Sequence, residues 1–397
     1  MRPAIRIGNT AAVVLLLVIT VACGTSSAPV TDTLSHTPDS SGSGTGTGGS
    51  SSASSPSSLG FLYVSGLTPS SPVVAAFEVN ADGSLQPLAG SPHPIEAVGL
   101  ASDPTQPFLF AVTQFDSASP NISSYALGGN GSLQFAGSVG GSFDATMSID
   151  PSGSTLYATQ QSGKYLVSFN IRSDGNLQRL GSITNGGGGT PLFLSDKLPG
   201  YAGVCVWRTA APNAPFAFPP TIAGYIRHAD GTLSKFDPHP PVPTNYCPNA
   251  LAFSPDGKFL VAGLFLSFNS DQQSLLGIYA IKADGTLVPV PGSPYPTASH
   301  RIFDVAFDPS GKYLLLAGYG GLYVYQFKAE ATPVSISQPA SALTAEIDQL
   351  VFSREGNLVF AFGGNDLYVF RFTDGELTPA PGSPHVLGFT PDSLAAR

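Results

Sequence analysis

Short apolar runs recur along most of this chain, and polar stretches rich in glycine and proline separate them. The runs consist mainly of Tyr, Phe, Val and Leu, which favour β-strands. The clearest are Phe61–Val64, Phe108–Val112, Thr155–Ala158, Phe259–Ala262, Tyr313–Ala317 and Leu358–Phe362. Further runs partner them, such as Tyr165–Phe169, Leu276–Ile281, Leu322–Phe327 and Leu367–Phe372. The pattern predicts an all-β protein of short paired strands.

Two series of turns alternate between these strands. The first series comprises Asp103–Thr105, Asp150–Gly153, Ser254–Gly257, Asp308–Gly311 and Ser353–Gly356. In most of these turns Pro sets φ and Gly supplies a positive φ. The second series reads D-G-x-L, in Asp82–Leu85, Asp174–Leu177, Asp230–Leu233, Asp284–Leu287 and Asp374–Leu377, with Asn130–Leu133 and Ala329–Ala331 as variants. The second series recurs at about 48 residues, a spacing that suits four strands and their loops.

Seven such units without room for crossover helices predict a seven-bladed β-propeller with four antiparallel strands in each blade. The first unit lacks an inner strand, because only low-complexity sequence precedes Phe61. The C-terminal stretch Pro391–Ala396 aligns with Pro248–Phe253, the expected inner strand of blade five. We therefore expect the C-terminal strand to close blade one and to leave no open sheet edge.

Composition narrows the class of protein further. Charged residues make up 11% of the chain and the net charge is −9, without a basic cluster, which argues against nucleic acid as a partner. The 45 glycines and 36 prolines argue against a helical bundle or a doubly wound α/β fold.

The N-terminal segment has the layout of an export signal. Arg2 and Arg6 precede an uncharged apolar run, residues 11–22, which as a helix would span about 18 Å and so falls short of a membrane. Thr20–Cys23 resembles a bacterial lipobox, which implies lipidation of Cys23, and Gly24 resembles the pattern of outer-membrane sorting. Cleavage to a free secreted protein is the alternative. Residues 1–23 are thus a predicted signal peptide.

Residues 24–58 are mostly Ser, Gly and Thr and cannot form a core, so they predict a flexible tether ahead of a propeller at residues 59–397. The expected location is the cell envelope, either at the outer membrane or in the periplasm or medium. Contact with a membrane is expected only through the N-terminal lipid, and the protein is expected to be monomeric.

Strand parity places both turn series on one face of the propeller, so the links that lead into the inner strands reach the opposite face, around the channel. Concave sites are expected there. In a chain with few charges, the polar residues of these links are the candidate site: Glu96, Asp144, Asn249, His300, Arg301, Asp304, Glu346, Asp348 and Asp392.

These residues allow more than one interpretation. Arg301, Glu346, Asp348, Asp392 and Glu96 belong to neighbouring blades and are expected to form a charged arc. Crowded carboxylates favour general-base chemistry or the binding of a cation such as Ca²⁺. The simpler interpretation is that these acidic residues are solvated loop residues. We expect no cofactor, with Ca²⁺ as the open alternative. His300 is the histidine placed for acid–base chemistry, and no histidine has metal-ligand spacing.

Two cysteines remain in the folded region. Cys205 lies near the end of a blade-four strand and Cys247 lies in the next link on the same side of the propeller. Export permits oxidation, so a Cys205–Cys247 disulfide is an expectation, with free thiols as the alternative.

The repeats Ala252–Val261 and Ala306–Leu314, the A-D-G-x-L turns and the Gly-Ser-Pro segments after them resemble the seven-bladed propeller lactonases. That family includes phosphogluconolactonases, muconate-cyclising enzymes and YVTN-type surface proteins. The resemblance implies a His-rich link before one inner strand and acidic residues after the next strand. Here the corresponding stretches are Asn245–Asn249 and Gly263–Phe268, which lack both features.

Two functions follow as hypotheses. One is a lactone hydrolase in which Arg301 holds a substrate carboxylate or phosphate and Asp348 or His300 activates water. The other is a non-catalytic surface propeller that binds a carbohydrate, peptide or protein over its channel face.

Overall fold

The fold was analysed in a computed structural model. The structure describes residues 58–113, 121–161, 163–184, 193–195, 198–204, 221–238, 246–265, 273–328, 331–337 and 346–397. The predicted signal peptide, the tether up to residue 57, Cys23 and Cys205 lie outside these residues. All regular elements in the described part are β-strands, and no helix there is long and apolar enough to cross a membrane.

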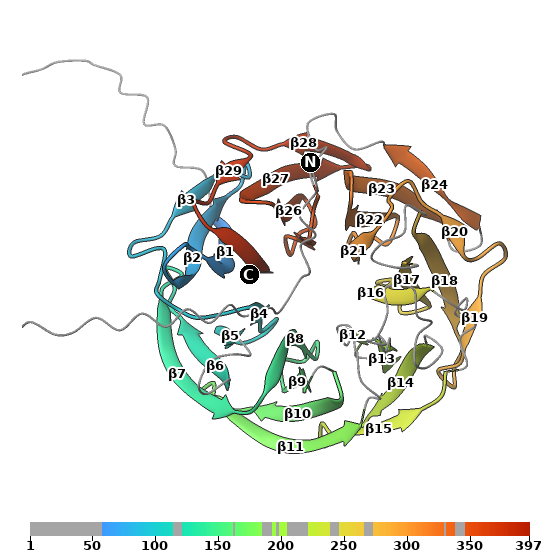
Figure 1. The fold of residues 1–397 in the computed structure, drawn as a ribbon, viewed down its shortest axis with the longest axis horizontal. Helices are drawn as coiled ribbons and strands as arrows, with labels where there is room; N and C mark the ends of the chain where they lie inside the picture. The colour runs from blue at the N-terminus through green and yellow to red at the C-terminus, as the bar shows by residue number, and fades with distance from the viewer. Residues whose placement is uncertain are drawn as a thin grey trace, which may run out of the picture. The chain divides into compact units, whose positions relative to one another are not determined.

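The strands form seven antiparallel sheets arranged as blades around a central channel (Figure 1). Blade one consists, from the channel outward, of β30 (Thr390–Ala396), β1 (Ser58–Leu67), β2 (Pro72–Asn80) and β3 (Leu85–Pro87). Blade two consists, in the same order, of β4 (Gly99–Ser102), β5 (Phe108–Val112), β6 (Asn121–Leu127) and β7 (Leu133–Gly140). Blade three consists of β8 (Phe143–Ile149), β9 (Thr155–Gln160), β10 (Tyr165–Ile171) and β11 (Leu177–Thr184).

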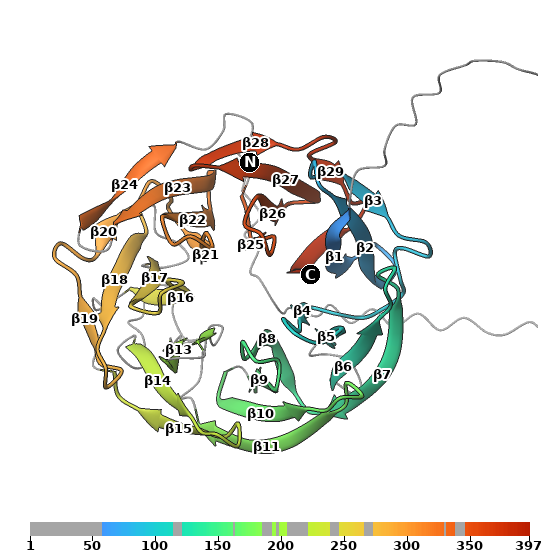
Figure 2. The same ribbon diagram turned by 180° about the vertical axis from the view of Figure 1, so that it is seen from behind.

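The remaining four blades continue around the ring (Figure 2). Their strands are β12 (Phe193–Ser195), β13 (Leu198–Val204), β14 (Thr221–Arg227) and β15 (Leu233–Phe236); β16 (Cys247–Phe253), β17 (Phe259–Phe265), β18 (Leu275–Ile281) and β19 (Leu287–Pro289), with β20 (Tyr295–Pro296) on β18; β21 (Ile302–Phe307), β22 (Tyr313–Gly318), β23 (Gly321–Lys328) and β24 (Ala331–Ser337); β25 (Gln349–Phe352), β26 (Leu358–Gly363), β27 (Asp366–Thr373) and β28 (Glu376–Pro379), with β29 (His385–Val386) on β27.

The predicted fold class, a seven-bladed propeller closed by its C-terminal strand, is confirmed. β30 pairs antiparallel with β1, with Val64 opposite Leu394. Because these strands come from opposite ends of the sequence, their pairing joins the last blade to the first. Leu394 and Ala395 are buried, so the closing strand is part of the core.

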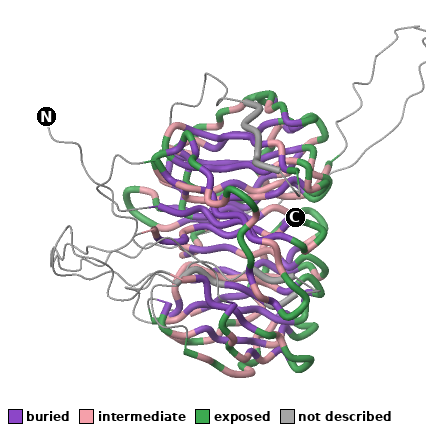
Figure 3. Tube along the Cα trace, turned by 90° about the vertical axis from the view of Figure 1, so that its right-hand side faces the viewer, coloured by how far each residue is buried: buried purple, intermediate pink, exposed green. Residues whose placement is uncertain are grey.

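Burial explains why the second strand of each blade reads as a continuous apolar run. Every residue of β5, β17 and β26 is buried, because these strands are covered by neighbouring blades on both sides. Outer strands such as β11 alternate between more and less exposed positions. In Figure 3 the strands run buried through the body and the exposed segments gather at the turns.

In blades one, three and four, a tyrosine on the second strand bonds to the D-G-x-L turn, or its N-G-x-L variant, of the next blade. Their hydroxyls donate to glycine carbonyls: Tyr63 to Gly131, Tyr157 to Gly231 and Tyr201 to Gly285, at 2.9, 3.2 and 2.6 Å. The glycines have φ values of 75°, 80° and 86°. The repeated glycine is therefore required by the turn conformation, and its carbonyl also fixes the spacing between blades.

Candidate functional site

The candidate site lies at the channel end where the links enter the inner strands. Arg301 directly precedes β21 and Asp348 directly precedes β25, whereas the Ser353–Gly356 turn lies at the other end of β25. Arg301 and Asp348 therefore lie on the face opposite the Ser353–Gly356 turn, as strand parity predicts.

Arg301 is half-buried between two aromatic rings. Its guanidinium carbon lies 4.7 Å from the ring centroid of Phe303 and 5.5 Å from that of Phe265. Such cation–π contacts orient a guanidinium and partly replace its hydration. Burial lowers the pKa of Arg301, and Tyr319, Glu346 and Asp348 act in the opposite direction. The side chain keeps its charge, because an arginine does not lose its proton in proteins.

Three predicted residues are thus brought together: Arg301, Glu346 and Asp348, across the seam between blades six and seven. Asp348 is exposed, Glu346 is half-buried, and both interact electrostatically with the guanidinium. His300 is exposed beside Arg301, and its carbonyl accepts a hydrogen bond from the Ser274 hydroxyl at 3.0 Å. This group combines a cation with two carboxylates, and an exposed histidine is next to the cation in the sequence.

A buried hydroxyl and a glycine hold the backbone of Arg301. The Ser299 hydroxyl donates to the Arg301 carbonyl at 2.7 Å, and the N–H of Tyr319 reaches the same carbonyl at 3.1 Å. A Cβ on Gly318 would lie 2.0 Å from that oxygen. The Gly318 carbonyl also accepts the N–H of Ile347 at 3.2 Å, which fixes the link that carries Glu346 and Asp348.

Sequence reasoning missed the aromatic part of the site. Tyr319, whose side chain is 40% exposed, packs edge to face on Phe303 at 5.3 Å between centroids. Phe265 reaches the site from β17, the second strand of blade five. The short loop Gly318–Gly321 is the sequence signal for Tyr319, because a loop of that length presents its one large side chain.

Asp304 and Asn249 bond to the backbone of the following blade. Asp304 accepts N–H groups from Leu350 at 3.0 Å and from Val305 at 2.8 Å, and the Asn249 amide donates to the Ile302 carbonyl at 3.0 Å. Corresponding bonds run from the N–H of Leu394 to Gln349 and from that of Leu100 to Ser393, at 2.8 and 3.1 Å. Asp304, Gln349 and Ser393 thus form a repeated latch between blades.

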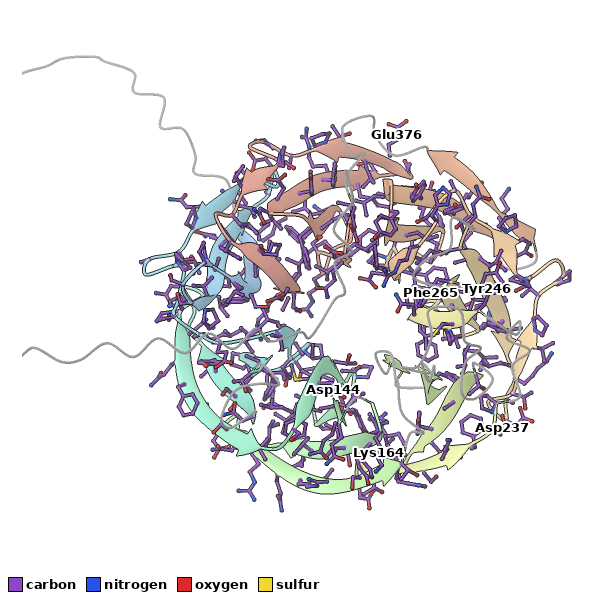
Figure 4. The ribbon with its side chains drawn as sticks, viewed as in Figure 1. Asp144, Lys164, Asp237, Tyr246, Phe265 and Glu376 are labelled. Atoms are coloured by element: carbon purple, nitrogen blue, oxygen red, sulfur yellow. The ribbon has the colours of Figure 1, made fainter. Side chains whose placement is uncertain are left out.

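The other predicted residues lie elsewhere around the ring. Asp144 accepts the N–H of Gly163 at 2.7 Å. Figure 4 places Asp144 on the blade-three side of the channel and Phe265 on the blade-five side. Asp392 is exposed on β30, and Glu96 is half-buried ahead of β4. The part of the predicted arc that Asp392 and Glu96 would form therefore stays a prediction.

Within the described residues, no group of three or more His, Cys, Asp or Glu side chains is arranged to hold a metal ion. Cys247 is buried at the start of β16, packs against Phe265, and is disulfide-bonded. Its predicted partner, Cys205, follows the last residue of β13 and lies outside the described residues, so that pairing stays a prediction.

Asp304 is the ionisable member of the latch, and its titration makes a testable prediction. Burial raises the pKa of Asp304 from 3.8 to about 7, despite the N–H groups of Leu350 and Val305. Between these two pH values the folded protein holds a proton that the unfolded chain has released, so the free energy of unfolding falls as pH rises, up to about pH 7.

The Asp304→Asn variant cannot ionise and should lose this part of the pH dependence. Its amide offers one acceptor oxygen for the two N–H groups, so the variant should be less stable than wild type at pH 4.5, and the difference should shrink toward pH 8. Urea unfolding at pH 4.5, 6 and 8 measures the difference. Asp374→Asn, at an exposed turn, is the control and should follow wild type. A slope for Asp304→Asn equal to that of wild type would show that Asp304 does not titrate in this range.

Together the fold and the site define a seven-bladed β-propeller with an arginine–carboxylate group at one end of its channel. No family model and no curated protein matches the sequence. Solved structures do match. A protein from Bacteroides uniformis assigned as a 6-phosphogluconolactonase superposes with a TM-score of 0.67 and 17% identity, covering 86% of this chain and 99% of the other.

A second protein with that assignment, from Bacteroides fragilis, gives a TM-score of 0.66 and 17% identity over 88% of this chain and 99% of its own. The periplasmic gluconolactonase of Pseudomonas aeruginosa gives 0.63 and 18% over 85% and 98%. At these identities the likeness shows a shared fold. The resemblance to propeller lactonases inferred from the repeats is therefore confirmed at the level of architecture.

Proposed function

We propose that this protein is a hydrolase of small lactones, a class of cyclic carboxylic esters, with its site at the junction of blades six and seven. The observation that carries the proposal is the placement of Arg301 between Phe303 and Phe265, beside the exposed carboxylate of Asp348. The shared fold with proteins described as gluconolactonases supports the substrate class.

In this mechanism the residues take separate roles. Arg301 binds an anionic substituent of the lactone. Asp348 accepts a proton from water as the water oxygen adds to the lactone carbonyl carbon. The bond between that carbon and the ring oxygen then breaks, and the ring oxygen leaves with a proton as a hydroxyl group. His300, exposed next to Arg301 in the sequence, is the alternative base, and Glu346 keeps the guanidinium oriented.

Hydrolysis of glucono-δ-lactone and of its 6-phosphate, followed as acid release above the spontaneous rate, tests these roles. Asp348→Asn should lower kcat for both substrates by about 10²- to 10⁴-fold, as expected on loss of a general base. Arg301→Ala should lower kcat/KM more for the phosphorylated lactone than for the neutral one, because only the former offers an anion. Asp374→Asn, which removes a carboxylate from the opposite face, is the matched control.

Equal rates for wild type and Asp348→Asn would remove Asp348 from the mechanism. Absence of hydrolysis by the wild type, together with saturable binding of the same lactones, would replace the hydrolase by a binding protein.

A non-catalytic propeller that binds a carbohydrate or a surface protein is the second candidate. It is favoured by the apolar character of β17 at its end, where the resemblance implies acidic residues. Leu264 and Phe265 are buried there, and Phe265 packs against Cys247 and the Arg301 guanidinium. In that case Tyr319 and Arg301 form the binding surface without any chemistry.

We further propose that the chain is exported, lipidated at Cys23 and bridged between Cys205 and Cys247. The apolar run before Cys23 and the disulfide-bonded state of Cys247 support this proposal. The intact mass of the mature protein, before and after reduction and alkylation, measures both modifications. An unmodified full-length mass would contradict export, and a reduced sample without newly alkylated thiols would contradict the bridge.

A further inference from the structure

A cavity of about 250 Å³ lies on the opposite face of the propeller, at the seam between blades seven and one. Leu59 and Phe61 from β1 and Phe360 from β26 give it an apolar lining, and Arg354, Glu355 and Arg397 stand on its polar side. The Arg397 guanidinium already donates to the carbonyls of Asp103 and Gln106, which leaves Arg354 as the cation available to a ligand. The cavity and the Arg301 site are therefore at opposite ends of β25.

The connectivity of blade one explains why a cavity forms here. At other seams, the turn between the first two strands of one blade packs on the same turn of the blade before it. A Cβ on Gly356 would lie 2.5 Å from Pro309, and one on Gly311 would lie 3.2 Å from Pro255. In blade one the first two strands are β30 and β1, which no turn joins, so among the described residues no such turn packs beside the Ser353–Gly356 turn.

The sequence of that turn also changes at this seam. Arg354 occupies the position of Pro255 and Pro309 in the turns of blades five and six. Arg354 and Glu355 are exposed, and neither side chain forms a hydrogen bond or ion pair with another of the described residues. A cation and an anion thus stand side by side at the rim of an apolar cavity.

We propose that this cavity binds an apolar α-amino acid, with its side chain among Leu59, Phe61 and Phe360, its carboxylate at Arg354 and its ammonium group at Glu355. An apolar cavity of about 150 Å³ already holds benzene, so the larger volume accommodates a phenylalanine or leucine side chain. Both charges of the ligand meet an opposite charge, which selects a zwitterion over a simple acid or amine.

Isothermal titration of the full chain with three ligands tests the proposal. L-phenylalanine has both charges, 3-phenylpropanoate lacks the ammonium group, and 2-phenylethylamine lacks the carboxylate. L-phenylalanine should bind most tightly, with each analogue weaker by up to about fivefold, the effect of one exposed ion pair. Equal affinity for the three ligands, or no heat with L-phenylalanine, would overturn the proposal.

Substitutions assign the two charges separately. Arg354→Gln should weaken L-phenylalanine and 3-phenylpropanoate but leave 2-phenylethylamine unchanged, and Glu355→Gln should do the converse. Leu59→Trp should fill the cavity and abolish binding of all three ligands. Arg371→Gln, at another exposed arginine, is the matched control and should bind like wild type. Unchanged binding in both Arg354→Gln and Leu59→Trp would place the ligand elsewhere on the protein, whatever the outcome of the lactone assays.

Discussion

Deletion of residues 390–397 is expected to abolish the cooperatively folded state at 25 °C. The deletion removes β30 and therefore the pairing that closes the ring, from Leu62 opposite Ala396 to Leu67 opposite Thr390. Burial of Leu394 alone contributes about 2–5 kcal/mol, and the whole domain has only about 5–15 kcal/mol of net stability. The unpaired edge of β1 would also invite aggregation.

Contacts with three blades are lost together in this deletion. Besides β1, the segment bonds to blade seven through Gln349 and to blade two through Ser393 and Arg397, which donates to carbonyls of Asp103 and Gln106. Circular dichroism melts and gel filtration measure the effect. Asp374→Asn, at an exposed turn, is the control and should melt like wild type, while Leu394→Ala should melt between wild type and the truncated chain. A truncated chain that melts within a few degrees of wild type would refute closure by β30.

Gly318→Ala is expected to destabilise the protein by about 1–3 kcal/mol, the range for overpacking in a close-packed interior. The added Cβ would lie 2.0 Å from the carbonyl oxygen of Arg301, and backbone cannot move aside as a flexible side chain can. The link that carries Asp348 is bonded to Gly318 as well, so any lactone hydrolysis should fall with stability.

Gly181→Ala is a suitable control, because a Cβ on Gly181 would meet nothing within 4 Å. Urea unfolding of both variants, with a lactone assay on the folded fractions, tests the expectation. If Gly318→Ala unfolds at the same urea concentration as Gly181→Ala, the close approach to Arg301 is wrong.

The architecture could be predicted from the sequence because its signals are local and repeated. The D-G-x-L turns set the number of blades, and the likeness of Pro391–Ala396 to Pro248–Phe253 identified the closing strand. Strand parity then placed Arg301, Glu346 and Asp348 on one face. These inferences need only the alternation of strands and turns.

The details of the site depend on contacts between blades, which carry no local signal. Phe265 lies far from Arg301 along the chain but stacks on its guanidinium. From the sequence, Asp304 cannot be distinguished from the other carboxylates around the channel. In the structure it accepts the N–H of Leu350 and so links its blade to the next one. Whether a polar side chain bonds to ligand or to backbone depends on the spacing of blades, and only the fold supplies that spacing.

The pairing of β30 with β1 makes circular permutation feasible. A short linker with the sequence of the Asp308–Gly311 turn could join residue 397 to residue 58, and new termini could then be opened at that turn in blade six. The permuted chain would keep every strand in place while its new linker occupied the corner beside Arg354. The proposed lactone site and the proposed amino-acid cavity could thereby be separated genetically, because the permuted protein would keep the first and lose the second.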